Sequence, residues 1–374
     1  MKKNKIISEI RKKNKQRKSQ SVQLLQKNKK PIRLNKSLSS WKASTALFLS
    51  SLIAVILVVP TLIVVPFMSD TDEQKAAVEQ VAEDVEIAMG DSSFAVEVMR
   101  ASSDEVEKVP LETYVSRVVA SEAPAEFEPE ALKAQALAAR TFIVNRLLHQ
   151  EDADQPDVTD TTSDQVYHNE EELRKSMGSE YEQEMRKINQ AVNETSGEIL
   201  TYQDTPITAA FFSTSNGYTE NSEDYWEEEV PYLRSVESPW DKDTQKFMDQ
   251  KIFTVGEVED QLDTDLPSID ELSMEISRTE GNRVNQLTLG DASYSGRDIR
   301  EELGLRSSDF SIEKKNDHLI FTTKGYGHGI GMSQFGANGM AAEGKSYEDI
   351  VQHYYKDVEI STVSDTAPTL AAKE

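Results

Sequence analysis

The chain has 374 residues, and its 66 Asp and Glu against 41 Lys and Arg give a formal net charge of −25. It contains no cysteine, which excludes disulfide bonds and thiolate-ligated metal sites. Fifteen of the Lys and Arg lie in residues 1–42, with a single acid, Glu9, so the rest of the chain carries 26 bases against 65 acids. A surface this acidic repels nucleic acid and other acidic polymers. We therefore expect no nucleic-acid partner, and a substrate that is neutral or held by a locally basic site.

The pattern of the first 69 residues predicts a membrane anchor. Residues 1–42 are basic and lack apolar periodicity, which is typical of a disordered cytoplasmic tail. Residues 43–69 are uncharged and rich in Leu, Ile and Val, a run long enough for a transmembrane helix. Because acidic residues such as Asp70 and Asp72 follow the run, we expect a single span with the N-terminus in the cytoplasm. A cleaved signal peptide is the alternative, but the run is too long and no A-x-A site follows it.

The remaining residues divide into a stalk, one large domain and a tail. Residues 70–92 are acidic and mildly amphipathic, and we expect a helical stalk ending near Gly90. Apolar residues at Phe94, Val96 and Val98 alternate with other residues, which predicts a half-buried strand at the start of the domain. We expect this extracytoplasmic domain to cover residues 93–361 and a loose tail to cover residues 362–374.

Two helices are predicted in residues 110–148, separated by a short break. In the first helix, Leu111, Val115 and Val118 recur on one face of a 3.6-residue period. Pro124 ends this helix, because proline disfavours the helical conformation of the residue before it. The second helix begins at Pro129, a favourable first-turn residue, and its alanine-rich face allows a neighbour to approach closely.

Glu122 continues the apolar series of the first helix, four residues after Val118 and eleven after Leu111. A carboxyl on a stripe that faces the core is partly desolvated, which raises its pKa. A glutamate that is protonated near neutral pH suits a general acid. A helix-end glutamate that reaches solvent fits the pattern equally well. The pattern alone leaves both interpretations open.

The later segments predict an α+β fold. Residues 150–164 are acidic and turn-rich and predict a loop, whereas residues 170–195 have helical spacing. Ser346 and Asp349 predict a capped last helix. Because strands and helices do not alternate regularly, we expect a helical region packed on mixed or antiparallel strands, with two lobes around a cleft. Short apolar runs bounded by turn residues predict strands at 198–202, 207–213, 272–278, 283–289 and 319–323.

Four long motifs follow one another along the domain. The first is VPLETYVSRVVASEAPAEFEPEALKAQALAARTF, which contains Glu122. The others are FFSTSNGYTENSEDYW at 211–226, VPYLRSVESPWD at 230–241 and GYGHGIGMSQFGANGMA at 325–341. In kind and order they resemble the stage II sporulation protein D family, over about residues 93–360. One departure is Ala123, where methionine is common in the family, and we expect it to alter packing rather than chemistry.

The resemblance implies a membrane-anchored lytic transglycosylase of engulfment during endospore formation. Its substrate would be peptidoglycan glycan strands already stripped of peptides, cleaved between N-acetylmuramic acid (MurNAc) and N-acetylglucosamine (GlcNAc) to leave 1,6-anhydroMurNAc ends. The family's catalytic glutamate maps onto Glu122, and no cofactor is implied. Implied partners are a wall amidase and a membrane anchor protein, and the implied location is the mother-cell membrane, with the domain facing the intermembrane space. The alternative is a non-catalytic wall-binding module or amidase enhancer, which would not require Glu122.

Two basic residues of the second helix, Lys133 and Arg140, are candidates for substrate binding. They lie seven residues apart, which places them on one side of a helix. A solvated basic edge is the ordinary interpretation of such a pair. The family pattern supports a role in the site, where the two would orient the glycan or bind the lactyl carboxylate of MurNAc.

The glycine-rich loop at 325–331 is a second candidate region, because glycines permit close approach of a backbone to a sugar chain. It does not fit G-x-G-x-x-G, and no strand–helix nucleotide context surrounds it. We expect it to present His328, Ser333 and Gln334 to the substrate, although a lone histidine is more often structural. Ser213 and Ser215 are expected to bond sugar hydroxyls, and plain strand chemistry explains them nearly as well.

Aromatic and acidic residues complete the candidates. Trp226 and Trp240 are suited to stacking on sugar rings, although core packing is the more frequent fate of tryptophan. Glu220, Glu223 and Asp224 are the candidates for a second carboxylate, which ordinary glycosidases need. Some relatives hold zinc near residues 157–168 through cysteines, and because this chain has none, we expect no metal.

Overall fold

The computed structural model describes residues 94–150, 155–161 and 163–371, all within the compact unit Ala77–Glu374. The tail, span and stalk expected at 1–42, 43–69 and 70–92 lie outside the described residues. In the part of the chain that is described, no helix combines the length and apolar character needed to cross a bilayer.

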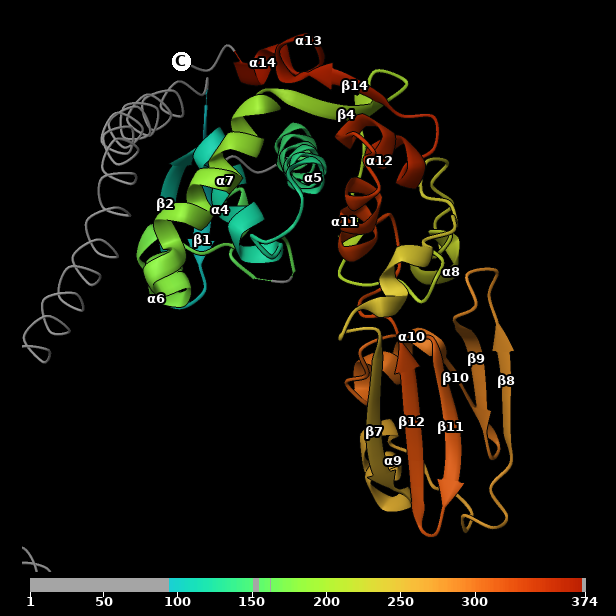
Figure 1. Cartoon of the computed structure of the whole chain (residues 1–374). Coiled ribbons are helices and arrows are strands. Elements are labelled where there is room, and N and C mark those ends of the chain that lie inside the picture. Colours follow the sequence, from blue (N-terminus) through green and yellow to red (C-terminus); the bar gives the residue numbers. More distant parts are fainter. Residues whose placement is uncertain (1–93, 151–154, 162, 372–374) are drawn as a thin grey trace, which may run out of the picture. The chain divides into compact units, whose positions relative to one another are not determined.

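Helices and short strands are interspersed along the described residues (Figure 1). The α-helices and 3₁₀ helices are α4 (Leu111–Glu122), α5 (Pro129–His149), α6 (Glu170–Met177), η1 (Gly178–Glu180), α7 (Tyr181–Glu194), α8 (Glu223–Trp226), η2 (Pro239–Asp243), α9 (Val255–Leu262), α10 (Gly296–Glu302), α11 (Gln334–Ala342), α12 (Tyr347–Tyr354), α13 (Val363–Thr366) and α14 (Pro368–Ala371). The strands are β1 (Ala95–Arg100), β2 (Glu105–Pro110), β3 (Val158–Thr159), β4 (Glu198–Tyr202), β5 (Thr205–Pro206), β6 (Phe211–Phe212), β7 (Met248–Thr254), β8 (Met274–Arg278), β9 (Val284–Leu289), β10 (Ala292–Ser295), β11 (Phe310–Lys315), β12 (His318–Lys324), β13 (Met332–Ser333) and β14 (Glu359–Thr362).

The strands form small sheets that are mostly antiparallel. Within the described residues the sheet orders are β2-β1-β3, β10-β9-β8, β11-β12-β7, β13-β6 and β14-β4-β5. Parallel pairing occurs between β1 and β3 and between β6 and β13. The expected α+β class with mixed sheets is confirmed, whereas two lobes around a cleft stay a prediction.

Helix α5 lies at the centre of the larger hydrophobic core, in contact with α4, α7, α11, α12 and β4 (Figure 1). Every side chain from Ala134 to Thr141 is buried, so this middle stretch of the helix is enclosed on all sides. Its alanines have small side chains, which let several neighbours approach the helix axis at once. Leu132, Leu137 and Ile143 fill the spaces between those neighbours.

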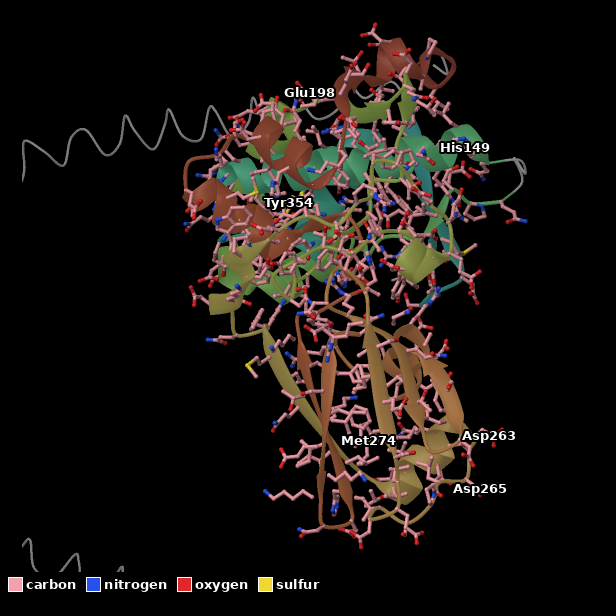
Figure 2. The ribbon with its side chains drawn as sticks, turned by 90° about the vertical axis from the view of Figure 1, so that its right-hand side faces the viewer. His149, Glu198, Asp263, Asp265, Met274 and Tyr354 are labelled. Atoms are coloured by element: carbon pink, nitrogen blue, oxygen red, sulfur yellow. The ribbon has the colours of Figure 1, made fainter. Side chains whose placement is uncertain are left out.

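A second hydrophobic core lies in the strand-rich segment between β7 and β12. It is built from the inward side chains of the β11-β12-β7 and β10-β9-β8 sheets together with α9 and α10, and includes Leu287, Ile299, Leu319 and Phe321. Figure 2 labels Met274 in this segment, and Glu198 and Tyr354 in the part built around α5.

Several predicted elements are confirmed. The two central helices are present: α4 ends at Glu122, before Pro124, and α5 begins at Pro129 as expected. The alternating strand appears as β1. Ser346 caps α12 in a capping box with Asp349.

Other expectations were wrong. The single helix expected at 170–195 is broken between α6 and α7, where Gly178 has a positive φ of 59° and ends α6. The expected loop at 150–164 contains β3, which pairs with β1. Instead of a loose tail, β14 pairs with β4 up to Thr362, and α13 and α14 follow; Val363 is buried there beside Ile199.

Candidate functional site

Glu122 is the last residue of α4, and the chain turns sharply after it. Ala123 is extended, and Pro124 prevents another helical turn. The Glu122 side chain is half-buried, and its Oε1 accepts a hydrogen bond of 2.9 Å from the Val166 backbone N–H. Burial raises the pKa of Glu122, and the bond from Val166 opposes this shift only in part.

The segment that carries Val166 is held along α4 by its neighbours. The Tyr114 hydroxyl donates to Gln165 Oε1 at 3.0 Å, and the rings of Tyr114 and Tyr167 are stacked with their centroids 5.7 Å apart. Burial raises the pKa of Tyr114, so this hydroxyl keeps its proton and stays a donor. The backbone that bonds Glu122 is therefore fixed by buried contacts on both sides of Val166.

A second attachment of the same segment lies next to Glu122 in sequence. The His168 backbone N–H donates to Ser121 Oγ at 3.1 Å, and His168 Nδ1 lies 3.0 Å from the same oxygen. The sequence predicted only a loop followed by a helix here. It missed Gln165 and Val166 because their role depends on a contact between segments far apart in the chain.

Gln334 lies beside Glu122 in the structure, whereas the sequence predicted that its amide contacts the substrate. Gln334 is the first residue of α11, and its Nε2 donates to the Glu122 backbone oxygen at 3.2 Å. The same nitrogen lies 3.4 Å from Gln135 Oε1 on α5. The amide of Gln334 therefore contacts the main chain of Glu122, and it is itself buried.

The three candidate serines use their hydroxyls within the protein. Ser215 Oγ donates to Asp241 Oδ2 at 2.7 Å, and Ser333 Oγ donates to Asp241 Oδ1 at 2.6 Å. Both serines are fully buried. Ser213 is half-buried, and its Oγ lies 3.2 Å from Thr214 Oγ1.

His328 lies in an aromatic cluster with Phe212, Tyr225 and Trp226, whose ring centroids are 5.7, 5.9 and 6.0 Å from its own. Its Nδ1 accepts a hydrogen bond of 2.9 Å from the Ile330 backbone N–H. Burial lowers the pKa of His328 to about 3, so the imidazole is neutral at ordinary pH. In this structure the ring packs the loop rather than presenting a charge.

The glycines of this loop are required by the protein itself. Gly329 has a positive φ of 93°, and a Cβ there would lie 2.4 Å from Arg283 Cζ.

Trp240, the other candidate for stacking on sugar, is half-buried. Its ring packs against His353, with the ring centroids 5.6 Å apart, and against Gly339.

Arg140 lies in the larger core, with no exposed surface. Its guanidinium binds both carboxylate oxygens of Glu112 on α4, with the closest atoms, Nη2 and Oε2, 2.6 Å apart. It also donates to the backbone oxygens of Val192 and Glu198. With all of these partners inside the protein, the guanidinium has no atom open to a glycan in this structure.

Lys133 occupies a different environment, although it shares α5 with Arg140. Its Nζ lies 2.7 Å from carboxylate oxygens of Glu130 and Glu194, and 5.7 Å from the centre of the Tyr347 ring. The structure therefore does not place Lys133 and Arg140 together as a basic pair.

The candidates for a second carboxylate, Glu220, Glu223 and Asp224, line a pocket of about 430 Å³ between α8, β9 and α10. Glu122 is not among the residues that line this pocket. Glu220 Oε2 lies 3.6 Å from Arg283 Nη1, and burial raises the pKa of Glu220. Glu223 forms two bonds of 2.7 Å with Arg234, which lower the pKa of Glu223. Asp224 accepts a bond from Asn221 at 3.3 Å.

Glu122 therefore differs chemically from Glu112, Glu220 and Glu223, each of which faces an arginine. Within the described residues it forms no ion pair, and a single backbone N–H bonds its carboxyl. A carboxyl in this state keeps its proton at higher pH than an ordinary glutamate does, and can donate it to a leaving oxygen.

Arg140→Ala is expected to lower the free energy of unfolding by about 3–5 kcal/mol, because it leaves the Glu112 carboxylate buried without its cation. Lys133→Ala is the matched control on the same helix, and its partly exposed ion pairs should contribute no more than about 1 kcal/mol. Urea denaturation of both variants measures the difference. An Arg140→Ala protein as stable as the wild type would show that the ion pair does not support the core.

Comparison with known proteins identifies the family. A family model described as SpoIID, Stage II sporulation protein, matches residues 99–202. Stage II sporulation protein D of Bacillus amyloliquefaciens is 47% identical over 341 residues, which cover 87% of this chain and 98% of that protein. The protein of the same name from Bacillus subtilis (strain 168) is 46% identical over 326 residues, covering 84% and 95%. A protein called Amidase enhancer, also from Bacillus subtilis, is 29% identical over 293 residues, covering 64% of this chain and 39% of that protein. The identity and coverage of the first two relatives show that this chain belongs to the stage II sporulation protein D family.

Proposed function

We propose that this chain is a lytic transglycosylase of peptidoglycan in which Glu122 is both the acid and the base. The observation that carries the proposal is the state of Glu122: half-buried, with a raised pKa and no ion-pair partner within the described residues. The substrate would be glycan strands stripped of their peptides, cleaved at the MurNAc–GlcNAc bond. These strands carry one lactyl carboxylate per MurNAc, so a protein this acidic needs a locally basic site to hold them.

One carboxyl is sufficient for this reaction. The protonated Glu122 gives its proton to the glycosidic oxygen, and the bond between that oxygen and C1 of MurNAc breaks. The Glu122 carboxylate then takes the proton of the C6 hydroxyl of the same MurNAc, whose oxygen bonds to C1. The products are a 1,6-anhydroMurNAc end and a free GlcNAc hydroxyl, and Glu122 recovers its proton. A hydrolase would need a second carboxylate to activate water.

The second candidate function is that of a non-catalytic wall-binding protein or enhancer of an amidase. It is favoured by the similarity to the Bacillus subtilis protein called Amidase enhancer. The two functions differ in what they require of Glu122, because a binding protein needs no transferable proton there.

We further propose that the chain acts in engulfment at the mother-cell membrane. The proposal rests on residues 43–69, an uncharged run flanked by basic and acidic segments. A wall amidase would supply the peptide-free strands, and a membrane anchor protein would hold the complex in place.

Glu122→Gln is expected to abolish cleavage of peptide-free glycan strands while glycan binding is kept. The substitution preserves size and hydrogen bonding but removes the transferable proton, and general acid catalysis typically contributes about 10²–10⁴-fold. Glu126→Gln is the matched control, because Glu126 lies exposed four residues later. Mass spectra of wild-type products should show ends lighter by one water than hydrolysis products. Undiminished cleavage by Glu122→Gln would remove Glu122 from the mechanism.

The cleavage rate is expected to fall as pH rises through the pKa of Glu122, because the reaction starts from the protonated form. Since burial raises this pKa, the fall should occur above the ordinary glutamate value of about 4.3. The folded protein also holds this proton more tightly than the unfolded chain, so this contribution to stability is complete at low pH and lost as pH rises through the folded pKa. A pH–rate profile checks the first expectation, and a fall centred at or below the ordinary value would contradict it.

Protease added to intact protoplasts is expected to remove the part of the chain after residue 69 and leave a small membrane-bound stub. The basic-to-acidic change across residues 43–69 predicts this orientation. Immunoblotting with antibodies against each end detects both fragments. Full protection of residues 70–374 would contradict the proposed location.

A further inference from the structure

Asp241 in η2 is a buried carboxylate at a point where three distant segments meet. It has no exposed surface and forms no ion pair within the described residues. It accepts hydrogen bonds from Ser215 N at 3.0 Å, Ser215 Oγ at 2.7 Å, Ser238 Oγ at 2.7 Å and Ser333 Oγ at 2.6 Å. A buried carboxylate is costly unless its oxygens are bonded, so these donors are held firmly in place.

Ser333 transmits this constraint to α11. Its hydroxyl has one proton, which points to Asp241, the nearest acceptor. The oxygen is then free to accept from the Gly336 backbone N–H at 3.2 Å, which caps the start of α11. One hydroxyl therefore fixes both the orientation of α11 and the position of its N-terminal end relative to Asp241.

Glycines let α11 approach η2 closely enough for this contact. A Cβ at Gly336 would lie 2.1 Å from Tyr354 Oη and 2.4 Å from Ser238 Oγ, and one at Gly339 would lie 2.3 Å from Trp240 Cβ. Because even one added carbon would overlap these atoms, α11 has no room to slide across η2.

Gln334, the first residue of α11, extends the constraint to Glu122. The last backbone oxygens of a helix lack partners within the helix, and the last turn of α4 has no basic residue to supply one. The Gln334 Nε2, at 3.2 Å from the Glu122 oxygen, supplies it. The chain of contacts thus runs from Asp241 through Ser333 and Gln334 to the main chain of Glu122.

We propose that Asp241 is a positioning residue that holds Glu122 in its working position through Ser333 and Gln334. Asp241 does not touch the reacting atoms; it acts on the acid that does. The proposal rests on the proposed function only in assuming that Glu122 is that acid. A displacement of about 1 Å in a catalytic group is enough to cost up to about 10²-fold in rate.

Asp241→Asn in the full chain is the first test, because the amide keeps the shape of Asp241 but replaces one acceptor oxygen by a donor. We expect kcat on peptide-free glycan to fall by about 10-fold to 10²-fold with KM unchanged. Asp243→Asn is the matched control, since Asp243 is an exposed residue of the same helix η2. Wild-type kcat in Asp241→Asn, or a loss confined to KM, would overturn the proposal.

A double-mutant cycle tests whether Asp241 acts through Gln334. Gln334→Met removes the amide donor while roughly keeping side-chain length. If the effect passes through Gln334, Asp241→Asn should add little to the loss in kcat caused by Gln334→Met. Losses that multiply independently would mean that Asp241 acts by another route, and would overturn the proposal.

A third measurement does not depend on cleavage activity. With glutamate side-chain carboxyls labelled with ¹³C, the NMR titration of Glu122 is identified by the signal missing from Glu122→Gln. Asp241→Asn is expected to shift this titration, and Asp243→Asn to leave it unchanged. An unshifted titration overturns the positioning role, whereas a wild-type protein that cleaves no glycan overturns only the proposed function.

Discussion

The ion pair between Arg140 and Glu112 is the interaction on which the rest of the helical part depends. It joins α4 to α5 inside the core, and the same guanidinium bonds the backbone oxygens of Val192, at the end of α7, and of Glu198, in β4. Charges that are fully removed from water are stable only when every donor and acceptor is matched. This requirement sets the positions of the four elements relative to one another. It therefore also sets the position in space of the C-terminal end of α4, where Glu122 lies.

Three buried or half-buried carboxyls are stabilised in different ways, and the difference separates their roles. Glu112 is neutralised by a guanidinium, and Asp241 is surrounded by hydroxyl and backbone donors. Glu122 has one backbone N–H and no cation within the described residues. The first two use their oxygens to hold the structure together, whereas Glu122, with a single internal donor, is the one suited to exchanging a proton.

Much of the helical part could be predicted from local patterns. Periodic apolar residues and the prolines at 124 and 129 placed α4 and α5, and the position of Glu122 on the apolar stripe of α4 gave partial burial as one of two open interpretations. The strand-rich segment was predicted less completely: α9, α10, β7, β10 and β11 were missed. In β7 and β11 almost no residue is buried, so no apolar pattern marks them in the sequence. The roles of Glu112 and Asp241 were missed as well, because neither has a local signal that separates it from a solvated acid.

By itself, the sequence determined the acidic charge of the chain after its basic tail and the absence of thiol chemistry, since both depend on composition alone. It also determined the two central helices and the glutamate at the end of the first, since these depend on spacing within a few turns. Only the tertiary structure decided what each charged or polar side chain faces. It placed Arg140 against Glu112 rather than beside Lys133, turned Ser215 and Ser333 towards Asp241, and brought Gln334 to Glu122 across 212 positions of the chain. The physical reason is that a buried polar group takes whichever partner the folded chain brings within hydrogen-bonding distance, and spacing along the sequence does not specify that partner.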